Sequence, residues 1–268
     1  MKKTLMTILV SGLMFASCSK QETTDNPLLQ KWDTPFETAP FEKIKVEHYL
    51  PAFEAAMEEH NKEIQAIIDN AEAPNFDNTI AALDYAGETL SKVAGVFGNM
   101  MAANTSEELQ KVNEEVAPMM ATHSDNVSMN ADLFAKIKKV YDAKDSQKYT
   151  GEQLALLEKT YNKFVRSGAL LDAAKQEELR KVNAELTKVE AKFDANLLKE
   201  SKAYQLVIDK EENLKGLPQG EIEKAAALAK EKGKEGKWIF TLDNPSFMPF
   251  VTYADNRDLR KEIFNARV

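Results

Sequence analysis

The feature that most constrains the fold is a long segment with helical periodicity, from Ala173 to about Lys199. Its apolar residues recur every three or four positions, and Lys and Glu fill the other faces. They are Leu179, Val182, Leu186, Val189, Phe193 and Leu197. This spacing predicts one amphipathic helix whose narrow apolar seam packs on a neighbouring element. A free-standing coiled coil is disfavoured, because the seam lasts only about three heptads and different, shorter helices surround it.

Shorter helical patterns precede this segment. From Val46 the apolar residues follow helical spacing until Ala73-Pro74-Asn75 interrupts them. Asp77 can cap a following helix, whose apolar face includes Gly87 and extends to Met101. No repeat of fixed period joins these segments, so a solenoid of regular helical repeats is disfavoured.

Two sequences with the form of a capping box predict further helix starts, Thr105–Glu108 and Thr150–Gln153. In each, a hydroxyl can accept a hydrogen bond from a free N–H, and the acidic or amide side chain can reach back. Apolar residues follow both at helical spacing, and Leu133–Val140 predicts a short helix between them.

Two strand-like segments follow the long helix, at 204–209 and 238–242, and both are rich in β-branched and aromatic residues. A helix is expected between them over Gln219–Lys232, and another over Tyr253–Ala266. The two strands can pair with each other. The expected fold class is therefore mainly α with two short strands, and the low content of 10 Gly and 9 Pro agrees with it.

The N-terminus has the form of a lipoprotein signal over residues 1–17. Lys2 and Lys3 precede an apolar run over Leu5–Phe15 that is too short to span a bilayer. Small residues then lead to Cys18, the only cysteine, which we expect to carry the lipid. An ordinary secretory signal with an incidental cysteine is the alternative. The expected location is the cell envelope, facing the periplasm or at the outer membrane, through a lipid anchor.

Residues 18–45 are expected to form a tether and an extended arm. The polar stretch Ser19–Asn26 has the composition of a tether. Trp32, Phe36 and Phe41 lie among prolines in the arm, and we expect them to anchor it across the helical body. Residues 46–268 are then expected to form a single helical lobe.

The charge pattern excludes one class of partner. The formal net charge is −8, and no basic stripe is present, so a nucleic acid is not expected to bind. Beyond the N-terminal run, no hydrophobic segment approaches the length that a membrane-spanning helix needs.

The three histidines, His48, His60 and His123, do not form a recognisable metal motif. No pair has the i, i+4 spacing that places two imidazoles on one helix face, and His-Glu-x-x-His is absent. His48 is expected to be structural at a helix start, and His60, in a charged stretch, to be solvated. His123 shares an apolar face and is expected to be a hydrogen-bonded core residue.

Signatures of a nucleophile or a phosphate loop are also missing from the sequence. Gly-x-Ser-x-Gly is absent, and Cys18 is assigned to the lipid. The glycines of Gly233–Gly236 follow a helix and precede a strand, the reverse of a phosphate loop. We therefore assign no catalytic residue and no metal ligand in these 268 residues.

Six strings in a fixed order carry a family resemblance. They are Val46–Glu54, Ala73–Leu83, Glu115–His123, Phe164–Ala169, Leu214–Pro218 and Trp238–Ser246 with Arg257–Arg260. Together they resemble the N-terminal part of a bacterial peptidyl-dipeptidase (dipeptidyl carboxypeptidase), from the thimet oligopeptidase and oligopeptidase A family of zinc metallopeptidases. The likeness extends from about Asn26 to the last residue.

The resemblance implies the multi-helix N-terminal lobe of a two-lobed, zincin-type oligopeptidase with a deep channel between its lobes. Such enzymes act on short peptides, and peptidyl-dipeptidases release dipeptides from free C-termini. Their zinc is held by the two histidines of His-Glu-x-x-His and a further Glu, in a C-terminal half that this chain lacks. The resemblance thus implies a zinc cofactor, short peptide substrates and a monomeric full-length protein.

Two hypotheses follow from the sequence. In the first, the chain is the N-terminal portion of an exported zinc peptidyl-dipeptidase, and the 268 residues are inactive on their own. The second is a non-enzymatic helical lipoprotein that uses the same lobe as a binding or scaffold module. A natural stop after Val268, with no peptidase sequence following, would favour the second.

Overall fold

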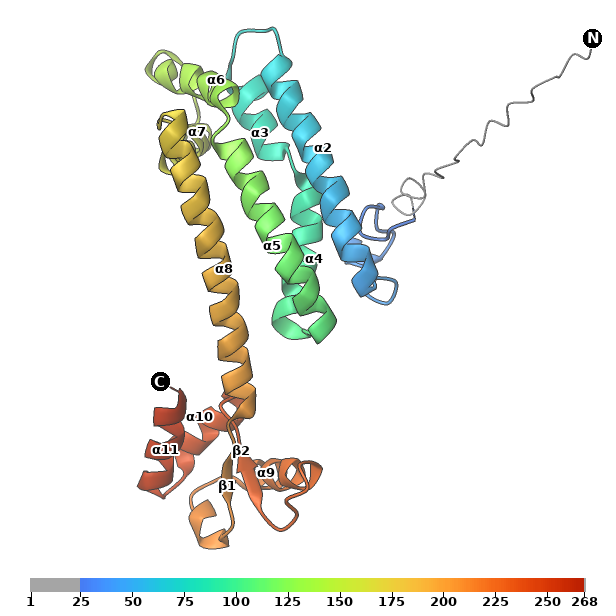
Figure 1. Ribbon diagram of the computed structural model, residues 1–268, viewed down its shortest axis with the longest axis vertical. Helices are drawn as coiled ribbons and strands as arrows, with labels where there is room; N and C mark the ends of the chain where they lie inside the picture. The colour runs from blue at the N-terminus through green and yellow to red at the C-terminus, as the bar shows by residue number, and fades with distance from the viewer. Residues whose placement is uncertain (1–24, 268) are drawn as a thin grey trace, which may run out of the picture. The chain divides into compact units, whose positions relative to one another are not determined.

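A computed structural model of the chain describes residues 25–267, which are mainly helical with one two-stranded sheet (Figure 1). The chain divides into two compact units, of which the first ends at Thr187 and the second begins at Lys188. Among the described residues, no helix combines the length and the apolar character needed to cross a membrane.

Most of the elements are α-helices. The first unit contains η1 (Pro35–Glu37), η2 (Val46–His48), α2 (Tyr49–Asp69), η3 (Phe76–Ala81), α3 (Ala82–Tyr85), α4 (Glu88–Ala103), α5 (Glu107–Ser128), α6 (Ala131–Asp142), η4 (Lys144–Ser146) and α7 (Gly151–Arg166). The long helix α8 (Ala173–Ala203) spans the division. The second unit continues with β1 (Leu206–Ile208), η5 (Glu211–Leu214), α9 (Gln219–Glu231), β2 (Trp238–Phe240), α10 (Asn244–Tyr253) and α11 (Arg257–Arg267).

One core of the first unit lies between α2, α4 and α5. Tyr49 and Phe53 of α2 meet Phe97 of α4 edge to face, with ring centroids 5.0 and 5.5 Å apart. Leu109 and Val116 of α5 complete the cluster and are buried. The helical spacing from Val46 onward thus correctly predicted α2 and its buried face.

The N-terminal arm packs on this core, but only in part as expected. Leu28 is fully buried, and the Asn26 side chain donates a hydrogen bond to the His48 carbonyl at 2.7 Å. Trp32 is partly buried against the same cluster. Phe36 and Phe41 are exposed, so the expectation that they anchor the arm was wrong. Phe36 lies in η1 with a φ of 60°, and its side chain is almost fully in solvent.

A second core of the first unit lies between α2, η3, α6 and α7. Phe134 of α6 stacks on Tyr161 and Phe164 of α7, with centroids 5.7 and 6.3 Å apart. Ile80 of η3 is fully buried against the same cluster. This core fixes the positions of α3 and α7, which carry the charged residues of the candidate site.

Two of the predicted helix caps differ in detail from the structure. The helix after the Pro74 break is capped by Asn75, not Asp77, because Asn75 and Asn78 exchange hydrogen bonds at 2.8 and 2.9 Å. Ser106, rather than Thr105, caps α5 by accepting from the Leu109 N–H at 3.2 Å. The capping box at Thr150–Gln153 is confirmed.

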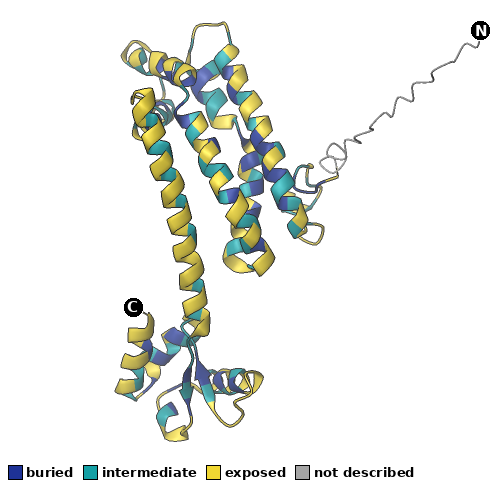
Figure 2. Ribbon diagram, in the orientation of Figure 1, coloured by how far each residue is buried: buried dark blue, intermediate teal, exposed yellow. Residues whose placement is uncertain are grey.

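The long helix α8 forms as predicted, but its seam does not pack as expected. None of its residues is buried (Figure 2). Five seam residues are between 51% and 64% exposed, namely Val182, Leu186, Val189, Phe193 and Leu197. Side-chain hydrogen bonds from Arg180 to Asn126 and from Asn183 to Asp125 attach its first half to α5. The expected apolar packing was therefore wrong for these five residues, whereas Leu179, the first residue of the seam, is partly buried beside Gly168.

The second unit is built around the predicted strand pair. β1 and β2 run antiparallel, with Leu206 opposite Phe240 and Ile208 opposite Trp238. Phe240 packs on Phe250 of α10, with centroids 4.6 Å apart. The helix expected over Tyr253–Ala266 begins later, at Arg257, because the Asn256 side chain accepts from the Asp258 and Leu259 N–H groups.

Candidate functional site

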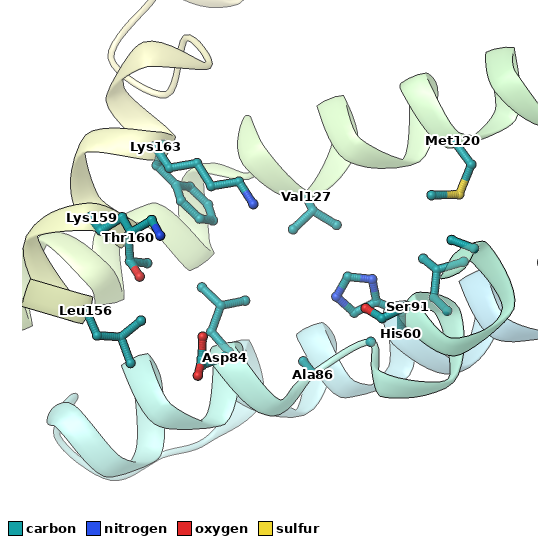
Figure 3. Close-up of a pocket in the computed structure, with 15 residues that line it drawn as sticks. His60, Asp84, Ala86, Ser91, Met120, Val127, Leu156, Lys159, Thr160 and Lys163 are labelled. Atoms are coloured by element: carbon teal, nitrogen blue, oxygen red, sulfur yellow. The ribbon is translucent and has the colours of Figure 1, made fainter. Parts of the chain in front are cut away.

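The first unit contains a cavity of about 450 Å³ whose wall comes from five helices (Figure 3). His60 of α2, Asp84 of α3, Ser91 of α4, Met120 of α5 and Lys163 of α7 line it. Its volume lies within the range of about 300–1,000 Å³ that is typical of small-molecule sites. The cavity is therefore the candidate site of this unit.

The cavity lies at a helix break that the sequence did not predict. One helix was expected from Asp77 to Met101, but Gly87 has a φ of 80° and separates α3 from α4. The Glu63 carboxylate of α2 accepts a hydrogen bond from the Gly87 N–H at 2.7 Å. A glycine tolerates this left-handed conformation without steric cost. The break therefore results from a local glycine and a carboxylate 24 residues earlier.

Two histidines meet at one side of the cavity. His60 Nδ1 and His123 Nε2 are 2.9 Å apart, with ring centroids at 5.0 Å. His60 is half-buried and His123 is buried. One ring must donate its N–H and the other accept, so the pair bonds when both rings are neutral.

Burial favours that neutral state. It lowers the pKa of both imidazoles below the ordinary value, because charging them would require solvation that the site does not supply. Glu63 opposes this lowering of the His60 pKa, whereas Lys163 reinforces it. The His60 ring adds to the lowering of the His123 pKa. Both rings are therefore mainly neutral at pH 7.

The histidine pair does not fit a zinc site. Zinc in proteins commonly has three or four side-chain ligands. The pair supplies two nitrogens that face each other in a hydrogen bond. Within residues 25–267, no group of three or more His, Cys, Asp or Glu side chains could hold a metal ion.

Charged side chains line the cavity from α3 and α7, and apolar side chains form its inner wall. Lys159 and Lys163 lie one turn apart on α7, and Asp84 lies across the space on α3 (Figure 3). All three are exposed, whereas Leu90 and Phe164 of the inner wall are buried. The site can thus offer opposite charges at its edge and an apolar surface within.

The structure places the three histidines in different situations. His48 accepts a hydrogen bond from the Lys45 N–H at 3.0 Å, which confirms a structural role at a helix start. His123 is a buried, hydrogen-bonded residue, as expected. The expectation that His60 is solvated was wrong, because its ring packs between His123 and Gly87. The sequence offers no signal for this pair, whose members are 63 residues apart.

Cys18, the predicted lipid site, lies outside the described residues.

The comparisons with known proteins agree with the resemblance of the six strings. No family model matches the chain. The chain is 34% identical over 244 residues to the dipeptidyl carboxypeptidase of Escherichia coli (strain K12), over 91% of this chain and 36% of that protein. It is 35% identical over 241 residues to the dipeptidyl carboxypeptidase of Salmonella typhimurium (strain LT2), over 90% of this chain and 35% of that protein.

This chain is a homologue of the dipeptidyl carboxypeptidase and oligopeptidase A family. The oligopeptidase A of Escherichia coli (strain K12) is 26% identical over 241 residues, which are 90% of this chain and 35% of that protein. The chain therefore spans little more than a third of the length of the curated relatives it matches. The family resemblance and the mainly helical fold class expected from the sequence are both confirmed.

Proposed function

We propose that this chain is the N-terminal portion of an exported zinc peptidyl-dipeptidase that hydrolyses short peptides and releases dipeptides from their free C-termini. The observation that supports this function is the identity of 34% and 35% with two dipeptidyl carboxypeptidases, against 26% with an oligopeptidase A. The described residues offer no set of zinc ligands, so the proposal places the catalytic zinc on sequence outside this chain.

The downstream reading frame provides the first test. We expect it to continue beyond Val268 and to encode His-Glu-x-x-His. Protein made from the complete frame should release C-terminal dipeptides from a short peptide, as followed by mass spectrometry. The same peptide with an amidated C-terminus is the matched control and should resist cleavage. A stop codon after Val268 would contradict the proposal and favour a binding or scaffold module.

The 268-residue chain provides a second test. We expect it neither to retain stoichiometric zinc after dialysis nor to cleave peptides. Metal analysis by mass spectrometry and a peptide-release assay measure the two properties. One tightly bound zinc per chain would show that the ligand set lies within these residues.

The lipid anchor on Cys18 is a separate part of the proposal. Export would place peptide hydrolysis at the cell envelope, and a lipid would hold the protein there. Labelling of the expressed protein with a radioactive fatty acid should require Cys18, and Cys18→Ser should remove both the label and membrane sedimentation. Equal labelling of Cys18→Ser and the parent protein would contradict the anchor.

A further inference from the structure

We propose that the exposed seam of α8 binds the same seam of a second copy of this chain, with the two helices antiparallel and centred between Thr187 and Lys188. The apolar side chains of the two seams would face each other, and Glu and Lys side chains along one flank would pair across the interface. This interaction goes beyond the proposed peptidase function and does not depend on it.

The first argument is the apolar surface of the seam, which the described residues leave in solvent (Figure 2). Four of its residues follow one another at helical spacing and are between 51% and 64% exposed, namely Val182, Leu186, Val189 and Phe193. Apolar residues at this spacing interlock when two helices pack along their length. A continuous apolar stripe in water is typical of an interaction surface.

The second argument is the order of charges beside the seam. Four exposed side chains recur every seventh residue along one flank, and they are Glu178, Glu185, Lys192 and Lys199. Within residues 25–267, none of the four has an ion-pair partner. Two acidic residues are thus followed by two basic residues. An antiparallel copy of the same helix presents this order in reverse, so that each Glu meets a Lys.

The flank also selects one register. When Leu186 lies opposite Val189 of the second copy, Glu185 lies beside Lys192 of that copy, and Glu178 lies beside Lys199. The symmetry of a dimer repeats each of these contacts. A shift by one heptad in one direction would place Lys192 beside its own copy, and a shift in the other direction would do the same to Glu185. Exposed ion pairs stabilise only slightly, but the repulsion in both shifted registers disfavours them.

The same charges disfavour a parallel pair. In parallel coiled coils, a residue on this flank meets the residue five positions further along the other helix. Glu185 would then meet Glu190 of the second copy, and both carboxylates are exposed and negative. In the antiparallel register, Glu190 lies beside the neutral Asn183 of the second copy instead. The charge pattern therefore favours an antiparallel second copy.

The dimer should be weak, because four apolar residues from each copy form a short interface. The helix is already formed in the single chain, so pairing does not have to fold it. We expect a dissociation constant that is micromolar or weaker. Unfolding measurements at low micromolar concentration would therefore report the single chain.

Analytical ultracentrifugation of the 268-residue chain, from micromolar to submillimolar concentrations, tests the interaction. We expect a reversible equilibrium between monomer and dimer. Glu185→Lys alone and Lys192→Glu alone each place like charges together at both copies of one contact. Each should weaken the dimer roughly tenfold. The two substitutions in one chain exchange the charges and should restore the dimer.

A mixture of the two single variants gives a sharper result. The mixture should dimerise more strongly than either variant alone, because one chain then carries only basic and the other only acidic side chains at these two positions. Matched controls are Glu177→Lys and Lys181→Glu, which make the same changes at exposed residues of α8 outside this flank and should leave the dimer unchanged. Circular dichroism checks that every variant is folded.

Three outcomes would overturn the proposal. A monomer at every concentration would leave the seam to a partner of another kind. A dimer that Glu185→Lys strengthens would be parallel, because the new charge would attract Glu190 of the second copy. A dimer that the control variants weaken equally would form through another surface. Because no hydrolysis is measured, failure would leave the proposed peptidase function untouched, and the reverse also holds.

Discussion

At the scale of single residues, the contact between His60 and His123 makes the first unit sensitive to acid. Each ring has a lowered pKa in the folded chain, mainly because of burial. The charged groups facing the pair are Glu63 from α2 and Lys163 from α7. Asp84 and Lys159 line the same cavity. Protonation of both rings would replace their hydrogen bond by repulsion.

We therefore expect the first unit to lose stability as the pH falls. In the unfolded chain both imidazoles titrate near the ordinary value of about 6.5. Below that pH the unfolded chain binds more protons than the folded chain. The stabilisation of the folded state by the neutral histidine pair is therefore present above about pH 6.5 and is lost as the pH falls below it. Thermal melts between pH 7.5 and 5.0 measure this loss. The double variant His60→Gln and His123→Gln should show a shallower pH dependence, and an unchanged slope would contradict the prediction.

Gly216 carries a second prediction at this scale. Its φ is 87°, and a Cβ atom there would lie 2.1 Å from the Tyr253 carbonyl oxygen. Gly216→Ala should therefore force the backbone apart and cost at least about 2 kcal/mol of unfolding free energy. Urea unfolding, monitored by circular dichroism, measures this loss of unfolding free energy. Gly220→Ala is the matched control, because nothing lies near that position in α9, and it should be neutral or stabilising.

At the scale of elements, the exposed seam of α8 leads to a third prediction. Val189 and Phe193 are 55% and 64% exposed, so replacing both by Gln should change the unfolding free energy by less than about 0.5 kcal/mol. By contrast, Phe53→Ala, in the core between α2, α4 and α5, should lower the unfolding free energy by about 3–5 kcal/mol. The double variant should also self-associate less, as measured by light scattering. A large loss of stability would mean that the seam is covered.

The elements also show what the sequence could predict. Helices such as α2 and α7 follow from periodicity and capping, which depend on residues a few positions apart. The break at Gly87 was missed because it also depends on Glu63, which lies in another helix. The pairing of His60 with His123 was missed for the same reason. The lining of the cavity likewise requires five helices to be placed in space before it can be recognised.

At the scale of the whole molecule, the buried clusters belong to one unit or the other. Phe53 belongs to a cluster of the first unit, and Phe250 to the cluster of the second. We expect two unfolding transitions in differential scanning calorimetry. Phe250→Ala should lower the midpoint temperature of only one transition, and Phe53→Ala that of only the other, because each variant removes buried surface from a single core. A single transition that shifts equally with either variant would contradict independent unfolding.

The absence of buried residues in α8 also determines how its backbone opens. Helices such as α2 can expose their amides only when a packed core separates, whereas the turns of α8 around Thr187 depend on local helix propensity. Amide protons in the middle of α8 should therefore exchange with deuterium much sooner than those in the middle of α2. The helix that joins the two units would then open and close more readily than the packed helix α2.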